Sequence, residues 1–152
     1  HREGLELADD DRQALGDSLP TWPPFDEVPS SLAELRSLGW RIGILSNTDP
    51  EFLDASLEAI GVPVDLRITA SEAGSYKPAH GHWERFFEQT GAERERHAHV
   101  AASLFHDIAP ANELGLRAVW VNRLRETSDL PRAAELGDLS KLPETLDDLV
   151  GA

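Results

Sequence analysis

The sequence of 152 residues contains no cysteine and no methionine. Without cysteine the chain cannot form disulfides, thiolate metal sites or a cysteine nucleophile, and this composition is typical of a reducing compartment. A translated chain normally begins with methionine, whereas this sequence begins with His1. We therefore expect it to be a piece of a longer protein.

Basic side chains are also scarce, with 14 lysines and arginines against 28 aspartates and glutamates, and a formal net charge of −14. Such a field repels nucleic acid and anionic membrane surfaces, so we expect neither as a partner. Long apolar runs are missing, whereas a membrane-spanning helix needs ~20 apolar residues. The first residues also lack the apolar segment of a signal peptide. These absences predict a cytoplasmic protein in which any anionic ligand is bound by local donors.

Short apolar runs alternate with amphipathic stretches over most of the chain. Buried strands are expected at residues 41–45, 64–69, 97–102 and 117–121. Helices are expected over residues 3–19, from Ser30 or Ser31 to Gly39, from Asp49 to Gly61, from Pro78 onward, from Asp107 to Gly115, and over residues 142–150. This order predicts right-handed crossovers and a parallel sheet covered by helices on both faces, which is an α/β fold.

Polar side chains follow three of the predicted strands. Ser46 and Asn47 come after the first strand, Lys77 after the second, and Ser103 and Asp107 after the third. Ligands of parallel α/β sheets bind beyond the carboxyl ends of the strands, so we expect these residues to converge on one crevice. Each also has an ordinary structural alternative: a capped turn, a solvated loop lysine or a helix cap.

Two histidine pairs, His80 with His82 and His97 with His99, have the i, i+2 spacing of metal ligands on a strand. The first pair lies at an expected helix start, and the second lies at the start of its strand, away from the ligand-binding edge. Because no cysteine or evident third ligand accompanies them, the sequence disfavours a zinc site. The glycine-rich loops of dinucleotide- and nucleotide-binding proteins are absent too.

Three stretches together resemble a known family. Ile44–Asn47, Lys77–Pro78 and Ser103–Ala111 are similar in order and spacing to the second, third and fourth motifs of the haloacid dehalogenase (HAD) superfamily. The segments Leu114–Arg117 and Val119–Arg123 resemble its 2-haloacid dehalogenase-like branch. The resemblance extends from about Phe25 to Arg123.

The resemblance implies a Rossmann-like, three-layer α/β/α core with a helical cap inserted after the first strand. Residues 1–22 would be the C-terminal part of that cap, and residues 23–152 the core without its first strand. In the family, that strand ends in the aspartate nucleophile, and no apolar strand bearing such an aspartate precedes Ser46 here. We therefore expect the parent protein to carry it upstream of His1.

The resemblance also implies roles for the residues at the strand ends. Ser46, Asn47 and Ser103 would bind the carboxylate or phosphoryl oxygens of a small anionic substrate. Lys77 would orient the nucleophile and offset its charge, and Asp107 would orient Lys77, or a metal ion and water. The family's reaction proceeds through an aspartyl intermediate that water then cleaves.

Two departures from the family pattern bear on the reaction. Phosphatase members carry Gly-Asp where this chain has Ala101 and Ala102, which removes one ligand from a magnesium ion that needs several oxygen ligands. True dehalogenases carry an asparagine where this chain has Leu104. We expect a dehalogenase without a cofactor. The alternatives are a phosphatase with Mg²⁺ at Asp107, or a non-catalytic HAD-like binding protein. A homodimer is a further alternative, favoured by an exposed sheet edge.

Overall fold

The structure is a computed structural model, and it describes residue 16 and residues 18–150 of the chain. The helix expected over residues 3–19 and most of the expected cap remnant lie outside the described residues. The described end of that remnant contains one 3₁₀ turn, η1, at Leu19–Thr21.

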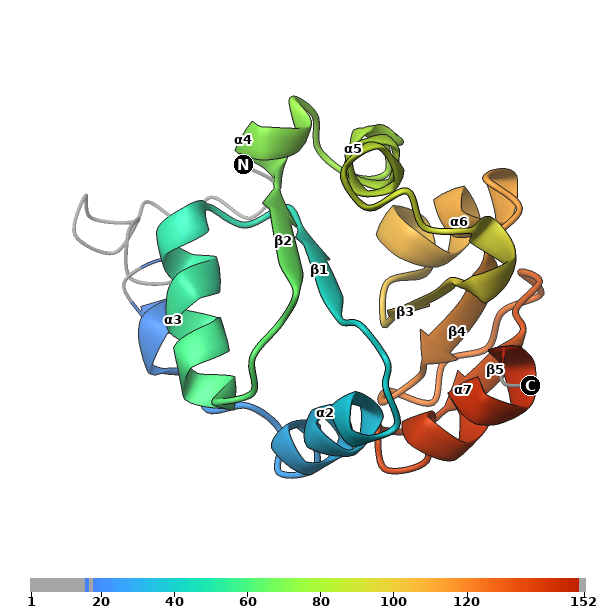
Figure 1. Cartoon of the computed structure of the whole chain (residues 1–152), viewed down its shortest axis with the longest axis horizontal. Helices are drawn as coiled ribbons and strands as arrows, with labels where there is room; N and C mark the ends of the chain where they lie inside the picture. Colours follow the sequence, from blue (N-terminus) through green and yellow to red (C-terminus); the bar gives the residue numbers. More distant parts are fainter. Residues whose placement is uncertain (1–15, 17, 151–152) are drawn as a thin grey trace, which may run out of the picture.

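Five short strands are present in the described part of the chain. They are β1 (Gly43–Ser46), β2 (Leu66–Thr69), β3 (Ala98–Ala101), β4 (Arg117–Val121) and β5 (Ala134–Leu136). Every strand pairing is parallel, which confirms the predicted α/β class (Figure 1). β5 was not predicted, because a three-residue strand with a glutamate at its centre carries no apolar run.

The helices connect these strands in the expected order. They are α2 (Val28–Ser37), α3 (Pro50–Ile60), α4 (Ala70–Ala73), α5 (Gly81–Thr90), α6 (Ala109–Glu113) and α7 (Leu142–Val150), with a 3₁₀ turn η2 (Arg94–Arg96) and a π-helical turn η3 (Leu104–Ile108). Three expected starts are wrong. α2 begins at Val28, before Ser30 and Ser31, and its N-cap is Glu27. Pro78 lies in a turn before α5, and Asp107 lies inside η3 because Ser103 caps that turn, its Oγ accepting a hydrogen bond from the His106 N–H at 3.1 Å.

The strands form two separate sheets, β1–β2 and β3–β4–β5. β1 and β3 are therefore both edge strands, and in Figure 1 they lie on facing sides of the centre of the molecule. Their apolar residues Ile44, Leu45, Val100 and Ala101 are only half-buried, unlike the nearly inaccessible residues of β4. Among the described residues no strand pairs with either of these edges.

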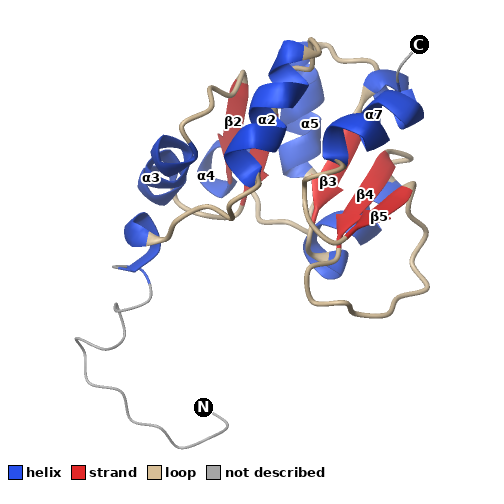
Figure 2. Cartoon of the chain, turned by 90° about the horizontal axis from the view of Figure 1, so that it is seen from below, coloured by secondary structure: helices blue, strands red, loops and turns tan. Residues whose placement is uncertain are grey.

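Two apolar clusters nevertheless hold the two sheets together. Ile44 and Val100 contact the cluster that α2 and α7 form on one face, whereas Leu45 and Ala101 contact the cluster of α5, η3 and α6 on the other. Consecutive residues of a strand point to opposite faces, so β1 and β3 contribute to both clusters in the same way. In Figure 2, α2 and α7 lie in front of the strands and α5 lies behind them. The result is three layers, as predicted.

No helix among the described residues is long and apolar enough to cross a membrane.

Gly81 sets the packing of α5 against the turn that follows α4. A Cβ atom at this glycine would lie 2.9 Å from the carbonyl oxygen of Ala73 and would also collide with the Ser75 side chain. Real Cβ atoms do not approach backbone this closely, so only glycine lets α5 start here. The same turn leads into Lys77, so this contact also determines where the lysine lies.

We predict that Gly81→Ala lowers the free energy of unfolding by about 1–3 kcal/mol, because the added methyl overpacks this contact. At an unhindered helical position the same change would instead stabilise the protein. Urea unfolding would measure the difference. Gly137→Ala is the matched control, because a Cβ there meets nothing within 4 Å. Equal stability of Gly81→Ala and the parent would contradict the contact.

Candidate active site at the carboxyl ends of the strands

Lys77 is held through its backbone by the side chain of Asn47. The Lys77 N–H donates to Asn47 Oδ1 at 2.7 Å, and Asn47 Nδ2 donates to the Lys77 carbonyl at 3.0 Å. The peptide bond between Lys77 and Pro78 is cis. Asn47 was expected to contact substrate; the structure places its amide against the lysine backbone, which fixes Lys77 relative to the end of β1.

The Lys77 side chain spans the space between the end of β1 and η3. Its Nζ donates to the Leu45 carbonyl at 2.9 Å and to Asp107 Oδ1 at 2.6 Å. The Ile42 carbonyl accepts hydrogen bonds from the start of β2. Because carbonyls alternate sides along a strand, the Leu45 carbonyl faces away from β2. The ammonium group therefore lies at the free edge of β1.

Asp107 completes a buried ion pair with Lys77. The two side chains are 9% and 10% exposed, respectively. Burial alone would raise the pKa of Asp107, but hydrogen bonds from His99 and Lys77, with the positive charge of the lysine, outweigh it and hold this pKa below its ordinary value. Asp107 is thus an anion at neutral pH. Lys77 and Asp107 lie together, as the sequence predicted.

His99 and Trp83 extend this network, and sequence reasoning missed both. His99 Nε2 lies 3.1 Å from Asp107 Oδ1, and Trp83 Nε1 donates to His99 Nδ1 at 3.3 Å. The two rings meet edge to face, with centroids 5.0 Å apart. His99 was assigned to the strand end remote from the site, but η3 folds back so that Asp107 reaches it. A histidine in a buried strand needs a polar partner, and that was the available signal.

The two serines form local contacts. Ser46 Oγ accepts from the Thr48 N–H at 3.2 Å, and the Ser46 carbonyl lies 2.9 Å from His82 Nε2. Ser103 Oγ lies 3.0 Å from His106 Nδ1, in addition to capping η3. Both serines therefore have the turn-capping contacts of the structural alternative, and among the described residues neither serine hydroxyl is hydrogen-bonded to the side chain of Lys77 or Asp107.

The described residues do not fit a magnesium ion. They contain no group of three side chains that could ligate a metal, and the two residues after Val100 are alanines. Asp107 Oδ1 already accepts hydrogen bonds from Lys77 and His99. A hard cation needs several oxygen ligands that this set does not supply.

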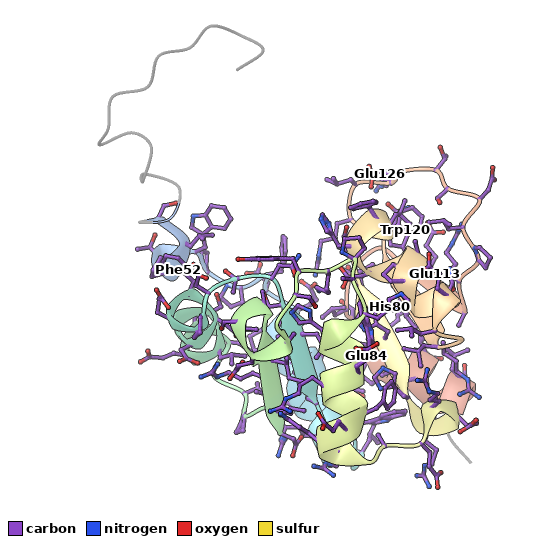
Figure 3. All side chains as sticks on the ribbon, turned by 90° about the horizontal axis from the view of Figure 1, so that it is seen from above. Phe52, His80, Glu84, Glu113, Trp120 and Glu126 are labelled. Carbon is purple, nitrogen blue, oxygen red and sulfur yellow. The ribbon has the colours of Figure 1, made fainter. Side chains whose placement is uncertain are left out.

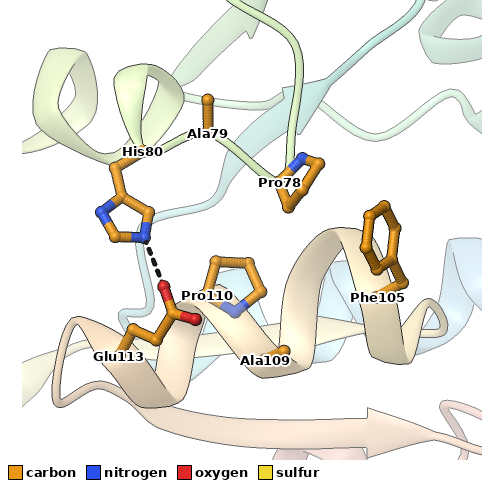
Figure 4. A pocket seen from close by; sticks show the side chains of 7 residues that line it. All are labelled: Pro78, Ala79, His80, Phe105, Ala109, Pro110 and Glu113. Carbon is orange, nitrogen blue, oxygen red and sulfur yellow. Dashed lines mark hydrogen bonds and ion pairs between the residues drawn. The ribbon is translucent and has the colours of Figure 1, made fainter.

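A depression of about 450 Å³ lies beside this network, between the turn after Lys77 and α6 (Figure 4). Pro78 and Phe105 border one end of it, while His80 and Glu113 pair at 3.0 Å at the other. Figure 3 also shows His80 and Glu113 close together, with Phe52 far away on α3. The lining of the depression is mostly apolar.

Comparison with known proteins gives one family and several relatives. A family model described as haloacid dehalogenase-like hydrolase matches residues 2–115. An (S)-2-haloacid dehalogenase of Pseudomonas sp. (strain YL) is 31% identical over 79% of this chain and 52% of its own length. A glyceraldehyde 3-phosphate phosphatase of Methanothermobacter thermautotrophicus is 28% identical over 81% of this chain and 58% of its own.

Solved structures share the fold. The L-2-haloacid dehalogenase of Xanthobacter autotrophicus, with chloropropionic acid covalently bound, superposes with a TM-score of 0.79 at 20% identity. The match covers 93% of this chain and 68% of that structure. The chain spans about half the length of the two curated relatives described above.

We predict that Asp107→Asn lowers the free energy of unfolding at neutral pH by about 3–5 kcal/mol, because it leaves the buried ammonium group of Lys77 uncompensated. The folded-state pKa of Asp107 lies below its ordinary value of 3.8. The contribution of Asp107 to the free energy of unfolding is therefore complete above pH 3.8 and is lost as the pH falls through the lowered pKa. The difference in free energy of unfolding between variant and parent should therefore become smaller below about pH 4.

Denaturant unfolding at several pH values measures this gap. The exposed Asp147 on α7 provides the control, since Asp147→Asn should leave stability nearly unchanged at every pH. A gap that stays constant down to pH 2 would contradict the depressed pKa.

Proposed function

Because the chain belongs to the haloacid dehalogenase-like hydrolases, we propose that it supplies the Lys77–Asp107 part of an active site that hydrolyses a small haloacid. The observation that carries this proposal is the buried ammonium group of Lys77 at the free edge of β1, bonded to both the Leu45 carbonyl and Asp107. A strand along this edge would end beside the ammonium group. We propose that such a strand, outside the described residues, carries the nucleophilic aspartate.

The proposed reaction has two steps. The aspartate carboxylate attacks the carbon that carries the halogen, the carbon–halogen bond breaks, and halide leaves with its electron pair. Water then attacks the carbonyl carbon of the resulting ester, which releases the hydroxy acid and regenerates the aspartate. Lys77 would offset the negative charge of nucleophile and substrate, and Asp107 would keep the ammonium group in place.

Anionic substrates have to overcome the net charge of −14. Lys77 provides a local cation, and Ser46, Asn47 and Ser103 surround the ends of the strands with hydroxyl and amide groups. We propose that these groups bind the substrate carboxylate, for which the hydroxyl of Ser46 and the second N–H of Asn47 would serve as donors. The rest of the substrate would face the apolar depression that Pro78 and Phe105 border.

Dehalogenation is favoured over phosphate release by the donor set. Ala101 and Ala102 offer no side-chain ligand, and Asp107 is already bonded to Lys77, so a magnesium-dependent reaction lacks its ligands in the described residues. A phosphatase remains the second candidate because a phosphatase is among the relatives. The third is a binding protein without activity. We further propose that residues 1–22 are the end of a helical cap and residues 23–152 the core.

We predict that the protein, expressed with any segment that its reading frame encodes upstream of His1, releases halide from a short 2-haloacid, and that EDTA leaves the rate unchanged. Halide and phosphate are measured in parallel, with a 2-haloacid and a small phosphate ester as substrates, with and without Mg²⁺. Phosphate release that needs Mg²⁺ would replace the first candidate with the second. Absence of both products would favour the binding protein.

We also predict that Lys77→Ala lowers the rate of halide release by about 10²-fold or more, because an electrostatic contact of this kind acts on the charge at the reacting centre. The chain offers a matched control in its other lysine: Lys141 is exposed and lies before α7. Lys141→Ala should keep the parent rate. Equal rates for the two variants would remove Lys77 from the site.

A further inference from the structure

Two consecutive residues of α5 reach both sheets. His82 Nε2 lies 2.9 Å from the carbonyl of Ser46 at the end of β1, and Trp83 Nε1 donates to His99 on β3. His82 and Trp83 are both fully buried. The helix therefore connects the end of β1 with the strand that carries the hydrogen-bond partner of Asp107.

The direction of each hydrogen bond follows from the donors available. The indole Nε1–H of Trp83 can only donate, so His99 Nδ1 has to accept. A neutral imidazole with an accepting Nδ1 carries its proton on Nε2, which therefore donates to Asp107 Oδ1. Trp83 thus selects the tautomer of His99, and that tautomer supplies a donor to the carboxylate that also accepts from Lys77.

We propose that Trp83 and His99 are positioning residues that orient the Asp107 carboxylate toward Lys77. With Oδ1 bonded to both His99 and Lys77, rotation of the carboxylate would break two hydrogen bonds at once. Its other oxygen, Oδ2, consequently keeps one direction relative to the ammonium group. This inference rests on the proposed function, in which Lys77 acts on the reacting groups, but the tautomer can be tested separately from activity.

His97, two residues before His99, has different surroundings and lies outside the hydrogen-bond network of Asp107. Its ring packs against those of Phe86 and Phe87 at centroid distances of 4.9 and 5.2 Å, and its buried Nε2 has no hydrogen-bond partner within the described part of the chain. Burial lowers the pKa of His97 to about 4, so this ring is a neutral packing group. His97 and His99 are two residues apart, and only His99 takes part in the polar network.

Four variants of the full-length protein test the proposal: His99→Leu, His99→Gln, Trp83→Phe and the control His97→Leu. His99→Leu removes the donor to Asp107 and should lower kcat by about 10- to 100-fold, as expected for a hydrogen bond to a charged group, with little change in KM. His99→Gln keeps an N–H donor and should recover most of that loss. His97→Leu should keep the parent kcat.

The second measurement is independent of turnover. In ¹⁵N NMR of the parent, His99 should carry its proton on Nε2 with an unprotonated Nδ1, and Trp83→Phe should redistribute the proton between the two nitrogens. If Nδ1 carries the proton in the parent, the proposal is overturned. It is also overturned if His97→Leu and His99→Leu lower kcat equally, or if His99→Gln is no better than His99→Leu. If the parent protein shows no turnover, the proposed function is rejected. The tautomer of His99 then still tests the positioning proposal by itself.

Discussion

The buried ion pair between Lys77 and Asp107 is the contact on which the rest of this site depends. Removing an ammonium group and a carboxylate from water is costly, and their attraction compensates only when the remaining hydrogen-bonding capacity is used. Here the Leu45 carbonyl and the His99 ring supply the further partners. Asn47 in turn fixes the backbone from which the lysine extends. Three segments distant in sequence are thereby set in one geometry.

Packing makes that geometry rigid. The residues that flank the ion pair belong to β1, β3 and η3, and the same apolar cluster, with Trp83 and Ile108 at its centre, lies beneath all three. Both of these side chains have no exposed surface. A displacement of η3 would therefore have to disturb close-packed rings as well as hydrogen bonds, and interiors of this density resist such shifts.

Sequence patterns predicted the strand–helix order and the convergence of Lys77 and Asp107, because parallel strands bring their carboxyl ends to one edge. The direct contact between the two side chains was expected only from the family resemblance. The same reasoning could not find His99 or Trp83. Ser103 caps η3, and this turn brings Asp107 back to His99 on β3, a return that no linear pattern indicates. Nor does a linear pattern indicate that the amide of Asn47 matches the backbone of Lys77, and the substrate role of Asn47 stays a prediction. The roles of Ser46, Ser103 and a missing first strand stay predictions.

Lys77 also has a consequence for the free edge of β1. Its ammonium group donates a hydrogen bond to the Leu45 carbonyl. This carbonyl is one of the acceptors that an added strand would use. Charged lysines at sheet edges are a known device against unspecific pairing. A segment that adds to β1 therefore cannot pair with the Leu45 carbonyl. This favours a register in which the added strand ends at the level of Leu45. The ammonium group that pairs with Asp107 thus also limits how far a strand can add along β1.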